Sequence, residues 1–163
     1  MEVDISYEYR EEDVRSQVDV EALALHVMNA EGKPQGTEVS ISFVTDEAIH
    51  ELNRDWRGVD RPTDVLSFEC DGFEDDEFDM SPTGFQPETF ELGDIVIAPD
   101  VAERQAPEFG LTFADELSLL LVHGLLHLCG YDHMEDDEAE VMEARETELL
   151  SSFYGRPFKR SAV

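Results

Sequence analysis

The hydrophobic positions of the chain follow two periods, and each period predicts one kind of element. Apolar and polar residues alternate strictly at 3–9 and 37–45, which predicts two strands that each have one apolar face. Two apolar runs at 64–70 and 93–99 predict two further strands, the second of them ended by Pro99. Together these segments predict a sheet of four strands.

Apolar residues recur at helical spacing in other segments, and this predicts helices at 18–32, 46–56, 112–129 and 136–153. Residues that begin and end helices support these bounds. Thr45 and Thr112 stand at the expected N-caps, and Gly32, Gly58 and Gly130 follow the expected last turns. The last helix is predicted to bury Val141, Ala144, Leu149 and Phe153.

The order of the elements, with strands mostly early and helices late, predicts an α+β fold. We expect a mixed sheet of about four strands packed against about five helices. The length of 163 residues suits a single domain that spans residues 1–163. The segment 71–91 is acidic and contains prolines and glycines, which predicts a long exposed loop within that domain.

The charge of the chain is unusual, because 40 acidic residues stand against 11 basic ones and give a net charge of −29. Disorder does not explain this composition, since 41% of the residues are hydrophobic and their positions are periodic. An acidic surface over an ordinary core fits a salt-rich cytoplasm, where the Debye length falls to about 3 Å at 1 M salt. An acidic protein of an ordinary cytoplasm is the alternative.

The cysteines and the apolar segments predict a soluble protein of the cytoplasm. The pair of cysteines, Cys70 and Cys129, argues against a disulfide scaffold and for a reducing compartment. The first residues lack the basic and apolar regions of a signal peptide. The longest apolar run, 117–122, is far too short to cross a membrane, so no membrane association is expected.

The segment HGLLHLCGYDH, residues 123–133, predicts a metal site. His123 and His127 lie one helical turn apart and project from the same face, and His133 follows a glycine that ends the helix. The spacing H-x-x-x-H-x-x-G-x-x-H is that of the zinc ligands in metzincin proteases. We therefore expect a zincin-like site on the helix 112–129 and its following turn, with a fourth coordination position open to water. Chance histidines of the core or the turn are the alternative.

The other potential ligands near this segment are predicted to have different roles. Cys129 follows His127 by two helical positions, about 200° around the axis, and is expected to pack in the core. His26 and His50 have no partner at ligand spacing and are expected at the solvent or at the edge of the core.

The residue after the first histidine distinguishes this segment from a protease. Metzincins carry their general-base glutamate there, whereas this chain has Gly124. Without that acid and base, an amine leaving group cannot be protonated efficiently, so peptide hydrolysis is disfavoured. A phosphodiester has a better leaving group and an anionic transition state, so a cationic side chain near the metal matters more. The segment DWRGVDRPTDVLSF, residues 55–68, offers two arginines.

Three motifs together resemble the YbeY family of bacterial endoribonucleases and rRNA maturation factors. They are LNRDWRGVDRPTDVLSF, LGDIVIAPD and HGLLHLCGYDH, and they lie in this order within residues 52–133. The resemblance implies a zinc-dependent endoribonuclease of the cytoplasm that cuts single-stranded RNA. It further implies roles in maturing the 3′ end of the small-subunit 16S rRNA, in ribosome assembly and in ribosome quality control.

The resemblance also assigns roles to individual residues. His123, His127 and His133 would bind the metal, which is zinc or, alternatively, nickel or another transition metal that accepts imidazole. Arg57 would be the essential basic residue, a role that suits a guanidinium able to bind two phosphate oxygens. A surface salt bridge is the alternative for Arg57. Three further residues are weaker candidates: Arg61 for a second phosphate contact, Ser67 for a substrate contact, and Asp132 either for the orientation of a ligand histidine or for the turn beside Gly130.

The expected partners are single-stranded rRNA, the small ribosomal subunit with its proteins and the assembly GTPase Era, and the chain is expected to be a monomer. The low number of basic residues departs from what an RNA-binding surface would suggest. Two other functions stay open on the residues alone. One is a zinc hydrolase with a peptide or small-molecule substrate, and the other is a ribosome-assembly binding protein whose metal is mainly structural.

Overall fold

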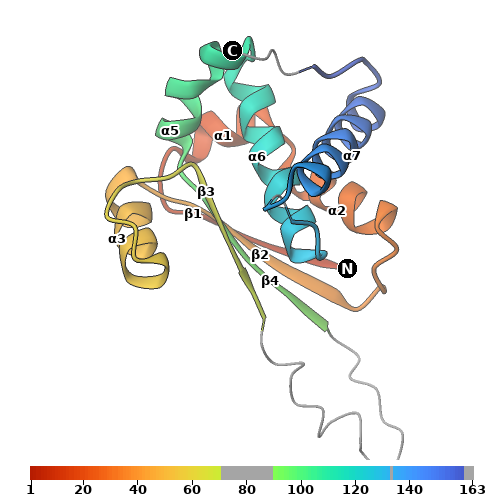
Figure 1. The fold of residues 1–163 in the computed structure, drawn as a ribbon, viewed down its shortest axis with the longest axis horizontal. Coiled ribbons are helices and arrows are strands. Elements are labelled where there is room, and N and C mark those ends of the chain that lie inside the picture. The colour runs from red at the N-terminus through yellow and green to blue at the C-terminus, as the bar shows by residue number, and fades with distance from the viewer. Residues whose placement is uncertain (71–89, 133, 160–163) are drawn as a thin grey trace, which may run out of the picture.

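The computed structural model describes residues 1–70, 90–132 and 134–159 (Figure 1). Within them a four-stranded sheet has the order β1-β2-β4-β3. The strands are β1 (Glu2–Tyr7), β2 (Thr37–Phe43), β3 (Val65–Glu69) and β4 (Phe90–Ile97). The first three strands in this order pair in parallel, and β3 pairs antiparallel with β4. The predicted mixed sheet and α+β fold are confirmed.

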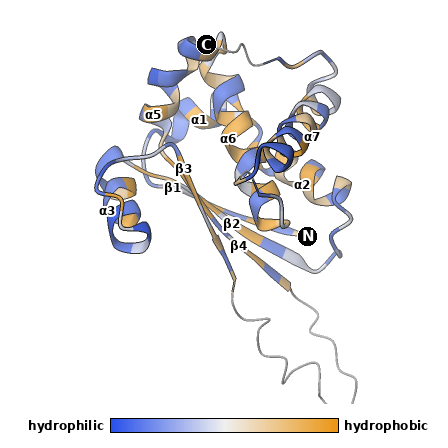
Figure 2. Cartoon of the chain, in the orientation of Figure 1, coloured by the Kyte–Doolittle hydropathy of each residue, from blue (hydrophilic) through white to orange (hydrophobic). Residues whose placement is uncertain are grey.

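The described residues also form six α-helices and one short 3₁₀ helix at Ala106–Phe109. The α-helices are α1 (Glu11–Gln17), α2 (Val20–Ala30), α3 (Asp46–Arg57), α5 (Pro99–Gln105), α6 (Phe113–Leu128) and α7 (Asp136–Tyr154). Helices α2, α6 and α7 lie on one side of the sheet, and α3 lies on the other (Figure 1). Figure 2 shows hydrophobic residues along the strands and hydrophilic residues over much of α3 and α7.

The core follows the alternation of the strands. Val39, Ile41 and Phe43 of β2 are each no more than 1% exposed and pack with the helices of the larger cluster. A smaller cluster on the other side of the sheet joins Ile49 of α3 to Leu66 of β3. Successive residues of β3 therefore face different layers, and its neighbours at 65 and 67 face α6.

Two helices were not predicted individually, and each has a clear reason. Helix α1 contains a single buried residue, Val14, so seven residues show no apolar period. Helix α5 begins at Pro99, which was interpreted as the end of a strand. Proline suits the first turn of a helix because its missing N–H is not needed there, so Pro99 both ends the run of β4 and begins α5.

Most predicted bounds agree with the structure to within a few residues. Thr45 and Thr112 accept hydrogen bonds from the backbone N–H groups of Ala48 and Asp115, as their predicted N-cap roles require. Strand β4 begins at Phe90, so the predicted loop 71–91 is shorter by its last two residues at least. The rest of that predicted loop lies outside the described residues.

The buried face of α7 differs from the prediction. Val141 is 61% exposed and Ala144 is exposed, whereas Leu149 is buried as expected and Phe153 is partly buried. The buried positions of this helix are Met142, Glu146, Leu149 and Leu150. The prediction was wrong because a charged residue, Glu146, occupies the centre of the buried face and interrupts its apolar period.

One glycine allows β3, β4 and α6 to pack closely. Gly93 has a φ of 148°, and a Cβ atom there would lie 2.3 Å from the carbonyl oxygen of Phe68 and 2.9 Å from Leu128 Cδ2. The pairing of β2 with β4 also shifts register here, between Glu38 and Val39. A side chain at this position would collide with both β3 and α6, and these two elements carry the site described below.

No single helix among the described residues is both long and apolar enough to cross a membrane, although α5 and the 3₁₀ helix together with α6 would pass on length and composition across a bend of 108°.

Candidate active site

The site lies at the C-terminal end of α6, where the chain leaves the helix as predicted. Gly130 has a φ of 102°, its N–H donates to the carbonyl of His127, and the N–H of Tyr131 donates to the carbonyl of Leu126. These two bonds form a Schellman motif that satisfies the last carbonyl groups and turns the chain back. The end of a helix carries a partial negative charge, which favours a cation at this place.

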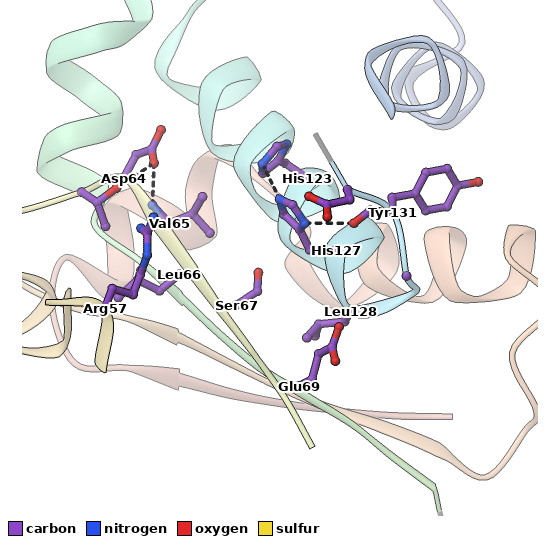
Figure 3. Close-up of a pocket in the computed structure, with 13 residues that line it drawn as sticks. Arg57, Asp64, Val65, Leu66, Ser67, Glu69, His123, His127, Leu128 and Tyr131 are labelled. Carbon is purple, nitrogen blue, oxygen red and sulfur yellow. Dashed lines mark hydrogen bonds between the residues drawn. The ribbon is translucent and has the colours of Figure 1, made fainter. Parts of the chain in front are cut away.

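His123 and His127 project from α6 toward one point. Their Nε2 atoms are 3.1 Å apart, and their rings meet at an interplanar angle of 86° (Figure 3). Two nitrogens bound tetrahedrally to one zinc ion at about 2.0–2.1 Å lie about 3.3–3.4 Å apart. The observed separation therefore fits a pair of zinc ligands with little rearrangement.

The other ring nitrogens are engaged by acceptors. His123 Nδ1 lies 2.6 Å from Oε2 of Glu146, and His127 Nδ1 lies 3.0 Å from the carbonyl oxygen of Tyr131. A carboxylate and a carbonyl accept hydrogen bonds, so the proton of each neutral imidazole sits on Nδ1. The two Nε2 atoms face each other at 3.1 Å, so a cation bound between them would be held by the Nε2 lone pairs of both imidazoles.

The third predicted ligand, His133, lies outside the described residues. Taken alone, the described ranges contain no group of three or more His, Cys, Asp or Glu side chains suited to hold a metal ion. The structure therefore brings together His123 and His127, and the completion of the set by His133 stays a prediction.

A cleft of about 520 Å³ opens beside the histidines. Its walls come from β3, from the end of α6 with the following turn, and from the end of α3, which contributes Arg57 (Figure 3). Among the described lining residues, Arg57 carries the positive charge, and Asp64, Glu69 and Asp132 carry negative charges. An anionic substrate in this cleft would therefore depend on Arg57 and on any bound cation.

Arg57 is the last residue of α3, and Asn53 holds the segment that follows. Asn53 is 1% exposed; its Oδ1 accepts a hydrogen bond of 3.3 Å from Arg57, and its Nδ2 donates one of 2.8 Å to the carbonyl oxygen of Arg61. Arg61 itself is exposed and is not among the residues that line the cleft. The sequence motif thus brings Arg57, but not Arg61, to the cleft.

Ser67 and Gly124 meet where β3 contacts α6. Ser67 lines the cleft, and its Oγ donates a hydrogen bond of 3.3 Å to the carbonyl oxygen of Gly124. A Cβ atom at Gly124 would lie 3.0 Å from Ile95 Cγ2 and 3.2 Å from Ser67 Oγ. The position where metzincins carry their glutamate therefore packs against the sheet, and no side chain fits there without displacing its neighbours.

The remaining candidate residues have defined places. Asp132 is exposed and lines the cleft on the turn after α6. Asp64 accepts hydrogen bonds from the N–H of Val65 and from the side chain of Gln105, so it shapes the start of β3. His26 and His50 lie away from the site, with Nε2 atoms 2.8 Å from Ser152 Oγ and 2.7 Å from an Asp60 carboxylate oxygen.

Cys129 is partly buried and packs against the main core. Burial raises the pKa of its thiol to about 11, with Lys33 opposing and Glu31 adding to this shift. A thiol that stays protonated at neutral pH is a poor metal ligand, because the thiolate is the ligand form. The prediction that Cys129 packs in the core agrees with this position.

Glu146 is the residue of the site that the sequence analysis missed. It lies on α7, 23 positions after His123, and its side chain is 8% exposed. A signal existed in the sequence, since a glutamate between the apolar residues Met142 and Leu149 falls on the face that a helix of this period buries. A buried charge on such a face calls for a partner.

The chain is similar to known proteins over most of its length. The sequence model of the family described as Endoribonuclease YbeY matches residues 4–154. A protein named Endoribonuclease YbeY from an Exiguobacterium species is 42% identical over 139 residues, which cover 85% of this chain and 87% of that protein. Its namesake from Shouchella clausii is 49% identical over 121 residues, 73% of this chain and 74% of that protein.

The fold also has a solved relative. The solution structure of a protein from Thermotoga maritima matches with a TM-score of 0.62 and 28% sequence identity, covering 94% of this chain and 89% of that one. The family model, which matches residues 4–154, spans the elements that build the cleft, from β1 to α7. The chain therefore belongs to the YbeY endoribonuclease family, as its three motifs predicted.

Proposed function

We propose that this protein is a metal-dependent endoribonuclease that cuts single-stranded RNA, with His123, His127 and His133 as zinc ligands. The observation that carries the proposal is the pair of Nε2 atoms, 3.1 Å apart, at a cleft whose opposite wall holds Arg57. Relatives that are 42–49% identical are named endoribonucleases. Zinc or a similar transition metal suits a site of neutral imidazoles.

A bound metal ion and two side chains, Arg57 and Asn53, have separate roles in the proposed reaction. A bound zinc ion would supply Lewis acidity toward a phosphoryl oxygen and would lower the pKa of a water molecule that it binds. Arg57 donates hydrogen bonds to the phosphoryl oxygens and stabilises the negative charge that grows on them during cleavage. Asn53 orients Arg57 from behind, through its Oδ1.

Gly124 accounts for the choice of substrate. The residue after His123 is a glycine that packs closely against Ile95 and Ser67, so the site has no glutamate there to protonate an amine leaving group. A phosphodiester needs that group less than a peptide does. The nucleophile is either water or the ribose 2′-hydroxyl, and a substrate with a single 2′-deoxy nucleotide at the cleavage site distinguishes them, since only the hydroxyl route is blocked.

Trp56 supports a single-stranded substrate. It precedes Arg57, is 71% exposed, and packs edge-on against Phe68 of β3, with ring centroids 6.1 Å apart. An exposed indole beside a phosphate-binding arginine offers a surface on which an unpaired base stacks. Stacking is not screened by salt, which suits a protein with 11 basic residues against 40 acidic ones.

The cellular role that we propose is maturation of the 3′ end of the small-subunit 16S rRNA, with roles in ribosome assembly and quality control. The proposed partners are the small ribosomal subunit, its proteins and the assembly GTPase Era, in the cytoplasm, and the proposed active form is a monomer. The support is family membership together with a cleft that suits RNA. A strain that lacks this gene should accumulate small-subunit rRNA with an unprocessed 3′ end, and the Arg57→Ala form should fail to correct it.

The direct test is cleavage of a labelled single-stranded RNA by zinc-loaded protein in molar KCl. Arg57→Ala is the test variant, and Arg54→Ala is its matched control, because Arg54 lies on the same helix and pairs with Asp55 at the surface. We expect the wild type and Arg54→Ala to cut and Arg57→Ala to be inactive. Equal cutting by all three proteins would contradict the role of Arg57.

The same preparations test the two alternative functions. Cleavage of casein would indicate a peptide hydrolase and would contradict the argument from Gly124. A ribosome-assembly factor with a structural metal would leave RNA uncut, and Arg57→Ala would correct the rRNA defect of the deletion strain as well as the wild type does.

A further inference from the structure

Helix α7 places Glu146 beside His123, at the ring nitrogen that does not face His127. Oε2 of Glu146 lies 2.6 Å from Nδ1 of His123, and the Glu146 side chain is 8% exposed. A distance this short is typical of a charge-assisted hydrogen bond. The contact joins residues that are 23 positions apart, so it forms only when α7 packs on α6.

Glu146 is held firmly in this position. Met142, Leu149 and Leu150 surround it on the buried face of α7 and are no more than 2% exposed. The next residue, Arg145, pairs with Glu31 at the end of α2 at 2.8 Å and donates a further hydrogen bond to the carbonyl of Ala30. Apolar packing and the Arg145–Glu31 ion pair therefore both hold the segment of α7 that carries the carboxylate.

The two histidines are supported differently. His127 donates from Nδ1 to the carbonyl oxygen of Tyr131, a neutral acceptor in the turn that ends its own helix. His123 donates to a full negative charge supplied by another helix. The carboxylate holds the imidazole of His123 in one orientation, with its Nε2 facing the Nε2 of His127.

From this asymmetry we infer that Glu146 is a positioning residue of the metal site, which fixes the tautomer and orientation of His123 and strengthens metal binding. The inference rests on the proposed function, because it takes His123 and His127 as metal ligands. Glu146 acts through His123 and does not need to touch the metal or the RNA. An acceptor on the far side of a ligand histidine typically contributes about 10–100-fold in metal affinity.

Two substitutions separate the charge from the hydrogen bond. Glu146→Gln keeps an oxygen that can accept from Nδ1 but removes the charge, and Glu146→Leu removes both while filling an apolar environment. Glu143→Gln is the matched control, because Glu143 is an exposed glutamate of the same helix. Circular dichroism and melting curves first establish that all variants fold.

The first measurement is the tautomer of His123 in metal-free protein, read from nitrogen-proton NMR correlations of the imidazole rings. We expect the Nδ1–H form in the wild type, in Glu143→Gln and in Glu146→Gln, and a mixture of tautomers in Glu146→Leu. The second is zinc affinity, measured by competition with a chromophoric chelator. We expect about a 10–100-fold loss for Glu146→Leu, an intermediate loss for Glu146→Gln and wild-type affinity for Glu143→Gln.

The outcomes separate this inference from the proposed function. Wild-type zinc affinity and an unchanged tautomer in both Glu146 variants would overturn the inference and leave the metal site intact. If His123→Ala bound zinc as tightly as the wild type, His123 would not be a ligand, and both the proposed site and the inference would be overturned. If Glu143→Gln lost as much zinc affinity as the Glu146 variants, the net charge of α7 would explain the loss. That result would also overturn the inference.

Discussion

The buried side chain of Asn53 joins Arg57 to the chain that follows it. Its Oδ1 accepts from the guanidinium of Arg57 and its Nδ2 donates to the carbonyl of Arg61, so one residue links the end of α3 to the middle of the loop that leads to β3. The N–H of Val59 also donates to the carbonyl of Asn53, at 3.2 Å. The position of Arg57 in the cleft therefore depends on a residue that does not line the cleft.

Replacing Asn53 with alanine should lower both stability and RNA cleavage. The change removes both hydrogen bonds of a side chain that is 1% exposed, which costs about 1–3 kcal/mol in all. It also frees Arg57, so kcat should fall more than KM rises. Urea unfolding and cleavage kinetics measure the two effects. Asn29→Ala is the control, since Asn29 is exposed on α2 and should change neither.

Any side chain introduced at Gly124 should lower the stability of the protein. In an ordinary helix interior, replacing glycine with alanine gains about 1 kcal/mol. Here a Cβ atom meets Ile95 at 3.0 Å and Ser67 at 3.2 Å, so we expect Gly124→Ala to lose about 1–3 kcal/mol in urea unfolding instead. Gly124→Glu should be less stable still and should not cleave casein. A stabilised Gly124→Ala would show that the packing around this glycine is loose.

Trp56 should contribute to RNA binding and little to folding. Its indole is 71% exposed, so truncation removes little buried surface. Loss of one stacked base costs about 1–3 kcal/mol, roughly a 5–150-fold rise in KM for single-stranded RNA, with kcat nearly unchanged. Phe90→Ala, which removes another exposed aromatic residue, serves as the control. Equal KM values for both variants and the wild type would exclude stacking on Trp56.

The sequence alone predicted the elements that local patterns encode. Alternation placed Val39, Ile41 and Phe43 in the core, and the cap residues Thr45 and Thr112 have the predicted hydrogen bonds. Three motifs sufficed to identify the family, which the comparisons confirm. These features depend on neighbours in the chain, and a period or a motif therefore records them.

The features that were missed depend on contacts between distant segments. Glu146 was missed because a charged residue interrupts the apolar pattern by which a buried helix face is recognised. Its partner His123 also lies on another helix. The tight contact at Gly124 arises only when α6 packs on β3 and β4. Asn53 resembles any polar residue of an exposed helix until its partners across the turn are known. His133 stays a prediction.

Cys129 should react slowly with alkylating reagents. Burial raises the pKa of its thiol to about 11, and the thiolate is the reactive form. In a Cys70→Ser variant, where Cys129 is the remaining cysteine, alkylation at pH 8 should be roughly 100-fold slower than in the urea-unfolded protein. The rate should rise as the pH approaches 11. Fast alkylation at pH 8 would mean an accessible thiolate and would restore Cys129 as a possible metal ligand.

A row of three glutamates across the sheet is one place where salt should raise stability by screening repulsion. Glu2, Glu38 and Glu91 stand opposite one another on β1, β2 and β4. The pKa of Glu38 is raised, first because its protonated carboxyl shares a hydrogen bond with Glu2, then by desolvation and by repulsion from neighbouring carboxylates. An acid whose pKa is raised by folding stabilises the fold below its unfolded pKa. That stability is lost as the pH rises through its folded pKa.

At neutral pH the row is therefore repulsive, and screening it should raise the melting temperature. With a net charge of −29, we expect the wild type to melt higher in molar KCl than in dilute buffer. Glu38→Gln should melt higher than the wild type in dilute buffer at pH 7, and this gain should shrink in molar KCl and at pH 4. Glu140→Gln removes a charge from the exposed face of α7 without facing such a row, so its gain should be smaller. A wild-type melting temperature that does not rise with KCl would contradict adaptation to a salt-rich cytoplasm. Equal gains in melting temperature for Glu38→Gln and Glu140→Gln would mean that the total charge, and not the row of glutamates, determines the effect of salt.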